Sequence, residues 1–194
     1  MILDVSSLRN NYYGFRHGES MANVRGIIVS DPAIGTVDYG LSDKGRAQVM
    51  ESAGRLQGLE NAVIVTSDFL RAVETAEILC SAFGIQSPAR EPRLRERYFG
   101  NWEGASYLHY ADTWNRDATD PDQERDGAES ANAVRCRMVE TVLDLDRSCS
   151  NCNVILVSHG DPLRMLQTAF EGLDTALNHT IPYFETAGWR LLNP

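Results

Sequence analysis

The chain has almost no lysine and no excess of positive charge. Lys44 is its one lysine, and 18 lysine and arginine residues in total stand against 27 aspartate and glutamate residues, for a formal net charge of -9. Nucleic acids and anionic membranes both attract basic protein faces, so this balance argues against either as the main partner. An arginine in this chain is therefore informative only where its place in a motif gives it a task.

Long apolar runs are also missing. No run approaches the roughly 20 residues that a membrane-spanning helix requires, and the beginning of the chain lacks the basic leader and apolar segment of a secretory signal. The sequence thus predicts a cytoplasmic protein that does not cross a membrane. A length of 194 residues and a hydrophobic content of 43% suit one domain over residues 1–194, with enough core to fold without disulfide or metal staples.

Cysteine is scarce, with four residues, of which Cys149 and Cys152 form a C-x-x-C pair. A structural zinc site would need a second pair of ligands at matching spacing. A redox pair normally opens a helix after a strand, whereas this pair precedes an apolar run. We interpret the two residues as an incidental pair of reduced thiols.

Short apolar runs alternate with stretches of helical periodicity. The runs cover residues 12–15, 62–65 and 154–157, and their length is typical of strands buried on both faces. Between and after them, apolar residues recur at helical spacing in these sets: Ala47, Met50, Ala53 and Leu56; Leu70, Val73, Ala76, Leu79 and Phe83; Ala131, Val134, Met138, Val142 and Leu145; Leu163, Leu166, Phe170 and Leu173. The alternation predicts a layered α/β domain.

Local signals predict the boundaries of these elements. Ser42, Asp68 and Ser130 have side-chain oxygens that can cap the first turns of three helices. Residues 117–127 are dense in acidic side chains around a proline and predict a solvated loop. Residues 182–186 and 188–192 predict two short strands around a turn, added antiparallel to an edge of the sheet.

Each apolar run ends in side chains suited to phosphate. Residues 16–20, with the sequence RHGES, follow the first run; Thr-Ser-Asp at 66–68, with Arg71 beyond, follows the second; and Ser-His-Gly at 158–160 follows the third. Open α/β sheets place their ligands outside the carboxyl ends of such strands. The sequence therefore predicts a phosphate-handling site in which two histidines and two arginines meet.

His17 is the expected nucleophile of this site. A neutral imidazole can attack phosphorus through one ring nitrogen if the other donates to a fixed acceptor, commonly a backbone carbonyl. Gly18 is expected to let the backbone approach an anion closely and to present its amides to it.

With these residues the chain resembles the histidine phosphatase superfamily, also called the phosphoglycerate mutase-like family, whose signature is an R-H-G-E/Q-S/T start. The resemblance covers nearly the whole chain, through Arg16-His17-Gly18-Glu19-Ser20 with Asn23, Leu41-Ser42-x-x-Gly45, Ser67-Asp68-x-x-Arg71-Ala72-x-x-Thr75-Ala76, Leu94-Arg95-Glu96-x-x-x-Gly100-x-Trp102-Glu103-Gly104, Gly127-x-Glu129-Ser130 with Arg137, and Ser158-His159-Gly160. It implies a three-layer α/β/α sandwich with a mostly parallel central sheet and one antiparallel edge strand.

The resemblance also implies the roles of individual residues. His17 becomes the phosphohistidine, and Glu96 protonates the leaving group. The phosphoryl oxygens are expected to be held by Arg16, Arg71, His159, Asn23 and Gly160. Fixed positive charge suits this task because the transferring phosphoryl group carries spread negative charge.

The same environment is expected to give the two histidines different charges. Nearby phosphate favours a protonated His159 when substrate is bound, whereas Arg16 favours a neutral His17. Glu96 can donate a proton in the first step and, once ionised, accept one from water in the second. Glu19 is a rival acid, but its place in the signature turn suits a structural role better.

No metal or other cofactor is expected. A cation site made of His17, His159 and Asp161 can be imagined, but the flanking arginines would repel a metal ion. His109 and His179 match no motif and are interpreted as surface or packing residues.

The first hypothesis is a metal-independent phosphomonoesterase acting on a small phosphorylated metabolite, with a phosphoprotein as the other candidate substrate. Residues 100–104 resemble the phosphatase branches of the family more than its mutases, and the chain is short of the insertions that a mutase leads us to expect. A cofactor-dependent phosphoglycerate mutase and a non-catalytic phosphate-binding scaffold are the alternatives.

Residues 27–29, Ile-Ile-Val, are more apolar than the resemblance leads us to expect. They can narrow the mouth of the site, contact an apolar part of the substrate or pack against the core, and packing is the preferred interpretation. The sequence leaves the physiological substrate and the oligomeric state open.

Overall fold

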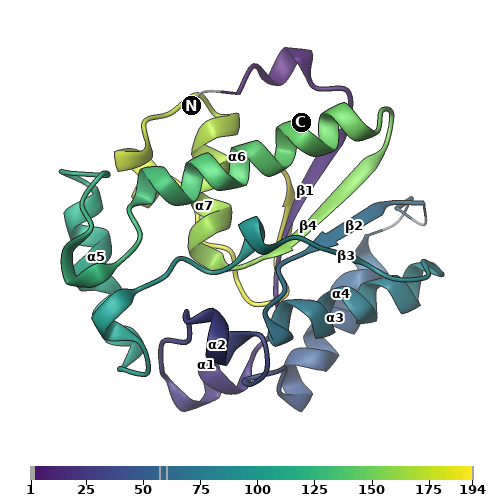
Figure 1. Ribbon diagram of the computed structural model, residues 1–194. Helices are drawn as coiled ribbons and strands as arrows, with labels where there is room; N and C mark the ends of the chain where they lie inside the picture. Colours follow the sequence, from purple (N-terminus) through teal and green to yellow (C-terminus); the bar gives the residue numbers. More distant parts are fainter. Residues whose placement is uncertain (1–2, 57, 60, 194) are drawn as a thin grey trace.

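The computed structural model describes residues 3–56, 58–59 and 61–193. Within them a sheet of five strands lies at the centre, in the order β3-β2-β4-β1-β5. The strands are β1 Asn11–Arg16, β2 Val63–Thr66, β3 Ala89–Arg90, β4 Asn153–Ser158 and β5 Trp189–Leu191. β1, β2, β3 and β4 run parallel to one another, and β5 pairs antiparallel with β1 (Figure 1). The predicted mostly parallel sheet with an antiparallel edge strand is confirmed.

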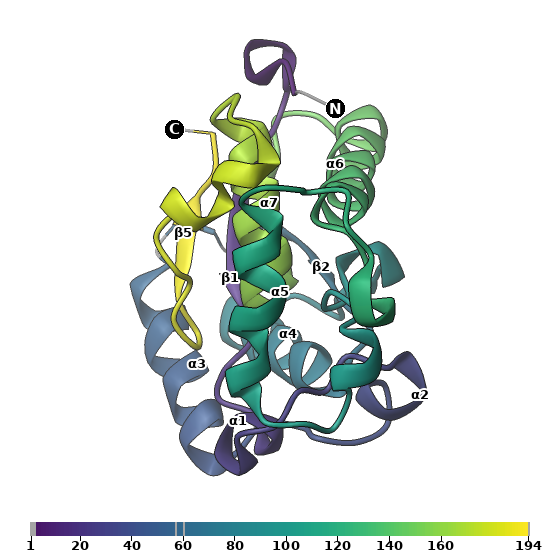
Figure 2. The same ribbon diagram turned by 90° about the vertical axis from the view of Figure 1, so that its left-hand side faces the viewer.

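Helices cover both faces of this sheet (Figures 1 and 2). The α-helices are α1 Met21–Arg25, α2 Pro32–Gly35, α3 Asp43–Arg55, α4 Leu70–Phe83, α5 Tyr110–Asp117, α6 Ala131–Ser148 and α7 Gly160–Phe170. Short 3₁₀ helices are η1 Val5–Ser7, η2 Pro92–Leu94, η3 Gly100–Trp102, η4 Tyr107–His109, η5 Arg125–Gly127 and η6 Thr175–Thr180.

Two apolar clusters, one on each face, hold the layers together. Side chains of α6 and α7 pack with Val154 and Leu156 of β4 on one face, and side chains of α3 and α4 pack with Ile155 and Val157 on the other. Successive residues of β4 thus enter opposite clusters, because side chains alternate across a strand. A strand buried on both faces needs an unbroken apolar run, which is the pattern in its sequence.

The predicted helix stripes hold for α4, α6 and α7 but not for all of α3. Met50 is 66% exposed, whereas Val49, one position away, is fully buried. The buried side of α3 carries small residues such as Gly45 and Ser52, which an apolar count overlooks. The strand β3 was not predicted, since it has only two residues and both are exposed.

The predicted helix cap at Asp68 is wrong. Ser42 and Ser130 do accept from backbone N–H groups in the first turns of α3 and α6. The N-cap of α4 is Phe69, which offers no side-chain cap. The carboxylate of Asp68 instead accepts two hydrogen bonds from the Arg95 guanidinium, at 2.7 and 2.6 Å, and such a bidentate pair is stronger than a neutral cap.

The structure also differs in part from the predicted strands at 182–186 and 188–192 and from the predicted solvated loop at 117–127. Residues 182–186 form no strand, because the carbonyls of Tyr183 and Phe184 accept from the side chains of Arg190 and Arg16 rather than from a neighbouring strand. Residues 118–127 are mostly exposed, as expected, but Asp117 is fully buried at the end of α5.

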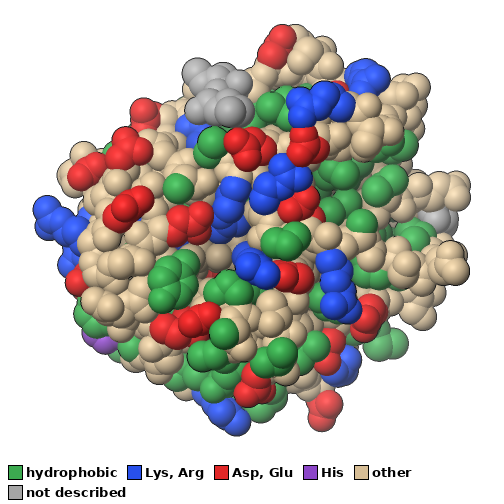
Figure 3. Space-filling model, viewed as in Figure 1, with side chains coloured by type: hydrophobic (Ala, Val, Ile, Leu, Met, Phe, Trp, Pro, Cys, Tyr) green, Lys and Arg blue, Asp and Glu red, His purple; other side chains and the backbone are tan. Residues whose placement is uncertain are grey.

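In the part of the chain that the structure describes, the cysteines, the helix lengths and the surface charge show no feature that points to a particular function. Cys149 and Cys152, like Cys80 and Cys136, are free cysteines. No helix within the described ranges combines the length and apolar character needed to cross a membrane. On the face seen in Figure 3, acidic and basic side chains are interspersed and form no continuous basic patch.

Candidate active site

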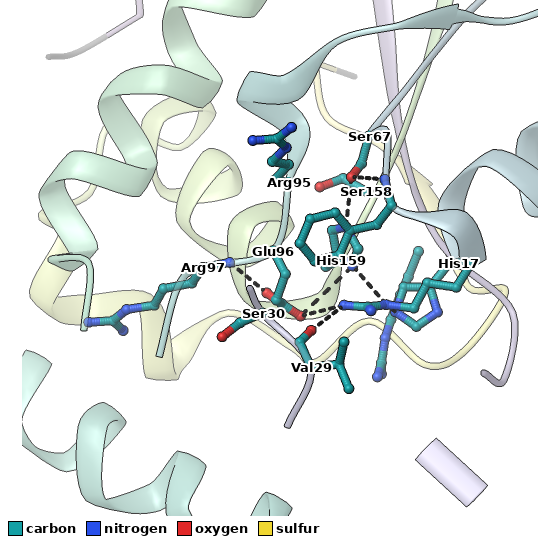
Figure 4. Close-up of polar contacts among 12 residues, drawn as sticks. His17, Val29, Ser30, Ser67, Arg95, Glu96, Arg97, Ser158 and His159 are labelled. Carbon is teal, nitrogen blue, oxygen red and sulfur yellow. Dashed lines mark hydrogen bonds and ion pairs between the residues drawn. The ribbon is translucent and has the colours of Figure 1, made fainter. Parts of the chain in front are cut away.

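The carboxyl ends of the central strands bring the predicted phosphate-binding residues together. β1 ends at Arg16 and leads into His17, β2 leads into Ser67, and β4 leads into His159. Figure 4 shows His17, Ser67, His159 and Glu96 converging from these separate segments. All of these side chains except Glu96, at 9% exposure, are at most 2% exposed.

The guanidinium of Arg71, from the first turn of α4, joins the two histidines. Its Nε lies 3.2 Å from His17 Nε2 and 3.2 Å from His159 Nδ1. An arginine Nε carries a hydrogen and can only donate. Both imidazole nitrogens therefore face Arg71 as acceptors, without a proton.

The remaining ring nitrogens fix the same tautomers. His17 Nδ1 donates to the carbonyl oxygen of Gly18 at 2.7 Å, and His159 Nε2 lies 3.0 Å from Ser67 Oγ. Burial lowers the pKa of both histidines well below its usual range, and the positive charge of Arg71 lowers it further. His17 is thus neutral with a lone pair on Nε2, which is the form that a nucleophile requires.

Arg16 and Arg71 each have a donor that no other described residue uses. Arg16 Nη1 donates to the carbonyl of Phe184 at 2.7 Å, and Arg71 Nη2 donates to that of Val29 at 3.0 Å. Arg16 Nε and Arg71 Nη1 are buried without a hydrogen-bond partner among the described residues. Both arginines line one small pocket with His17 and Glu96, so these donors are available to an anion there.

Glu96 is buried in the loop after η2, with its carboxylate beside the histidine pair. Glu96 Oε2 lies 4.0 Å from Arg71 Nη2 and 3.9 Å from His159 Nδ1, and Oε1 accepts from the backbone N–H of Arg97. Burial raises the pKa of Glu96 to about 7, although the Arg71 charge opposes this. A carboxyl group with this pKa can donate and accept a proton near neutral pH.

Two further arginines hold the Glu96 loop in place. Arg137 of α6 donates to the carbonyls of Arg93, Arg95 and Glu96, at 2.5, 2.9 and 3.2 Å. Arg97 is fully buried and forms a bidentate pair with Asp117, at 2.5 and 2.9 Å. The sequence places Arg137 in a family motif but predicts a solvated loop for Asp117. For Arg97, the one signal in the sequence is that arginine occupies every second position at 93, 95 and 97.

We expect Asp117→Asn to destabilise the protein by about 3 kcal/mol, because it leaves the buried Arg97 charge without its main counter-ion. The nearest other carboxylate is Asp161, whose Oδ2 lies 3.5 Å from Arg97 Nη1. Urea denaturation measures the change. Glu51→Gln is the matched control, since it removes an exposed ion pair with Arg55 and should cost less than about 0.5 kcal/mol. Equal midpoints for both variants would contradict the structural role of Asp117.

The expected role of Gly18 is wrong. Its amide donates to Thr75 Oγ1 at 3.1 Å, and the next amide, that of Glu19, donates to the Gln48 side chain. Neither is free for an anion. A Cβ at Gly18 would lie 2.5 Å from the carbonyl oxygen of Gly45, so glycine is needed for close packing of this turn on α3.

Asn23 lines the phosphate pocket, whereas Gly160 is buried and is not among its lining residues. The Asn23 Oδ1 accepts from the Ser20 amide in a capping box at the start of α1, and its exposed side chain also lines the pocket. Gly160 opens α7, and a Cβ there would lie 3.0 Å from Tyr183 Oη and 3.4 Å from Arg16 Nε. Glycine at this position leaves room beside the free Arg16 donor.

Glu19, His109 and Asp161 contact other protein groups. The Glu19 carboxylate accepts from Lys44 and Ser42, which lower its pKa, in agreement with a structural role. His109 stacks on Trp102 with ring centroids 4.1 Å apart. Asp161 is buried against the pocket, and burial raises its pKa. In the described part of the chain, no group of three or more His, Cys, Asp or Glu is arranged to hold a metal ion.

Comparison with known proteins identifies the family. The model of the histidine phosphatase superfamily (branch 1) matches residues 13–193. The chain belongs to this family. This histidine phosphatase chain is 30% identical over 169 residues to a glucosyl-3-phosphoglycerate phosphatase of Mycolicibacterium vanbaalenii, a match that covers 81% of the chain and 72% of the relative.

Other similar proteins carry phosphatase and mutase names. A probable phosphoglycerate mutase of Cronobacter sakazakii is 32% identical over 169 residues, covering 83% of the chain and 74% of that protein. The native structure of a mycobacterial glucosyl-3-phosphoglycerate phosphatase superposes with a TM-score of 0.77 at 27% identity, covering 92% of the chain and 87% of that structure. The expected fold and family are confirmed, and the phosphatase relatives support activity as a phosphoric monoester hydrolase.

Proposed function

We propose that the protein is a metal-independent phosphomonoesterase that hydrolyses its substrate through a phosphohistidine on His17. The observation that carries this proposal is the position of Arg71 Nε, 3.2 Å from both His17 Nε2 and His159 Nδ1. Because Arg71 Nε can only donate, this contact shows that His17 Nε2 carries a lone pair and not a proton, and the same pocket holds two arginines with unused donors and the Glu96 carboxyl. A binding scaffold would need neither the neutral nucleophile nor the buried acid.

In the first step, His17 Nε2 forms a bond to phosphorus and the bond from phosphorus to the leaving oxygen breaks. The leaving oxygen takes the electron pair and the proton of the Glu96 carboxyl, and departs as an alcohol. The Gly18 carbonyl holds the Nδ1 proton and so stabilises the positive charge that develops on the ring.

In the second step, a water oxygen forms a bond to phosphorus and the bond to His17 Nε2 breaks, returning the electron pair to the ring. The ionised Glu96 takes the proton of the attacking water, which restores the starting protein and releases phosphate. One carboxyl group can serve both steps because burial places its pKa at about 7.

Positive charge around the phosphoryl group comes from the protein itself. Arg16 and Arg71 supply the fixed charges, and Asn23 and Gly160 are the further candidates for contacts with the phosphate. We expect His159 to take up a proton at Nδ1 when dianionic phosphate binds, because the anion outweighs the neighbouring arginines that lower its pKa in the free protein. The transition state then faces two guanidinium groups and an imidazolium.

The expected result of the direct test is release of inorganic phosphate from small phosphomonoesters at an undiminished rate in EDTA. A quenched-flow experiment with 4-nitrophenyl phosphate should also show a burst of nitrophenol, or of ³²P bound to protein, of up to one equivalent. Loss of activity in EDTA that returns with added metal would overturn the metal-independent mechanism. Absence of any hydrolysis would overturn the proposal that the protein is a phosphatase.

A phosphoglycerate mutase is the second candidate, favoured by the similarity to a protein with that name. A mutase must return the phosphoryl group to its product, so with a 2,3-bisphosphoglycerate primer it converts 3-phosphoglycerate into the 2-isomer without phosphate release. Hydrolysis accounts better for the similar phosphatases and for the absence of mutase-like insertions in the sequence. Isomer formation faster than phosphate release would decide for the mutase.

A further inference from the structure

A second, larger cavity adjoins the phosphate pocket. Its volume is about 650 Å³, within the range of ordinary small-molecule sites. It is lined by Arg16, Ala22, Asn23, Gly26, Ile27, Tyr107, Leu108, Tyr110, Ala111, Trp114 and Tyr183. The inference drawn from it rests on the proposed phosphatase function.

The two cavities share part of their walls. Arg16, Asn23, Ile27, Trp114 and Tyr183 line both, so the outer cavity opens directly from the place where a phosphoryl group would meet His17. In-line attack places the leaving oxygen on the side of phosphorus opposite His17 Nε2. The outer cavity is the larger space adjoining the phosphate pocket into which a leaving group can extend.

Aromatic side chains form much of this outer wall. Tyr110 and Trp114 of α5 stack with ring centroids 5.1 Å apart, and Tyr183 lies 6.4 Å from Trp114. Figure 2 shows α5 beside the segment that leads into β5, which carries Tyr183. At the rim, Tyr107 and Leu108 are 54% and 68% exposed. Apolar groups left open next to a site are typical of a surface that a ligand covers.

Positive charge in the lining itself, by contrast, lies at the phosphate end. The Arg164 guanidinium packs on the Trp114 and Tyr183 rings, 5.8 and 5.7 Å from their centroids, but is not among the lining residues. Among the described residues, Arg16 is the one charged residue in the outer lining, and it also lines the phosphate pocket. The adjoining phosphate pocket is lined by two cations, Arg16 and Arg71, and by the carboxyls of Glu96 and Asp161. Because Arg16 and Arg71 are taken by the phosphoryl group in the proposed mechanism, a second anionic group on the leaving side would lose hydration without a cation of its own, which is costly.

We propose that the substrate is a phosphomonoester whose leaving group is uncharged and largely apolar, such as an aryl or medium-length alkyl group. The aromatic wall takes the apolar group, and the polar tips of Asn23 and the tyrosines can accept or donate at most a few hydrogen bonds. This specificity differs from that expected for esters of phosphoglycerate, whose carboxylate would enter the outer cavity.

The proposal is tested with pairs of substrates that share the type of leaving oxygen but differ in whether the leaving group is charged. Hexyl phosphate and 3-phosphoglycerate both have primary alkyl leaving groups, and 4-methylphenyl phosphate and free phosphotyrosine both have phenol leaving groups. In each pair we expect kcat/KM to be higher by about tenfold or more for the uncharged ester. An equal or reversed preference would overturn the proposal.

Adding a positive charge to the cavity should reverse this preference. In Ile27→Arg we expect the ratio of kcat/KM for 3-phosphoglycerate to that for hexyl phosphate to rise about tenfold or more. Leu108→Arg, at the exposed rim, tests the same point if the first variant does not fold. Met50→Arg is the matched control, because Met50 is 66% exposed on α3 and lines neither cavity. An unchanged ratio in both cavity variants would contradict the inferred specificity.

These results are separable from those that test the phosphatase itself. If no ester is hydrolysed and no phosphoenzyme forms, the proposed function fails. If esters are hydrolysed but charged ones are preferred, the phosphatase stands and only the inferred substrate class is wrong.

Discussion

His17→Ala is expected to lower kcat for phosphate release by at least about 10⁴-fold, because it removes the atom that forms the bond to phosphorus. Arg16, Arg71 and His159 remain to bind the substrate, so inorganic phosphate should still inhibit or bind. The loss should therefore appear in kcat and in the burst, which disappears, far more than in substrate affinity.

The measurement is steady-state and quenched-flow hydrolysis of 4-nitrophenyl phosphate, together with acid-labile, base-stable ³²P on the protein. His179→Ala is the matched control: His179 is exposed and its Nδ1 contacts only the Ala176 carbonyl within the described residues, so activity should stay unchanged. Circular dichroism and phosphate binding separate loss of chemistry from loss of fold. Labelled protein in the His17→Ala variant would place the nucleophile elsewhere.

Glu96→Gln is expected to lower kcat by about 10²–10⁴-fold for alkyl phosphates. An alkoxide is a poor leaving group and needs the proton of the acid. A 4-nitrophenolate needs little help, so the first step should fall much less for 4-nitrophenyl phosphate. The second step still lacks its base, and the phosphoenzyme should accumulate with this substrate.

The pH dependence of wild-type activity is a second test of Glu96 as the general acid. Burial raises the pKa of Glu96 to about 7, so the carboxyl is protonated below that pH and ionised above it. For alkyl phosphates, where the first step needs the acid, activity should fall as pH rises through about 7, and this limb should vanish in Glu96→Gln. Glu124→Gln, in an exposed segment, is the matched control. A Glu96→Gln profile identical to the wild type would refute the assignment.

Much of the fold was predictable because its signals are local. β4 reads as an unbroken apolar run because both its faces are buried, and the stripes of α6 and α7 repeat at the helical period. His17, Arg71 and His159 follow strand ends or open a helix after one, and parallel strands bring their carboxyl ends to one edge. The meeting of these residues therefore followed from strand order and direction.

Features that depend on distant partners were not predictable in this way. Asp68 has the composition of a helix cap, but Arg95 takes its carboxylate. Asp117 looks like part of an acidic loop, yet it lies buried against Arg97, 20 positions earlier. Gly18 looks like an anion-binding glycine, but Thr75 takes its amide and α3 packs against it.

The site shows the same division. The residue types around the phosphate pocket, and the resemblance they carry, came from the sequence alone. The tautomers of His17 and His159, the raised pKa of Glu96 and the apolar cavity beside Arg16 came from the packing of separate segments. Sequence determined the family and the catalytic candidates because each motif is a short stretch of chain. Only the tertiary structure decided proton positions and the shape of the leaving-group site, because both depend on burial and on contacts between residues far apart in sequence.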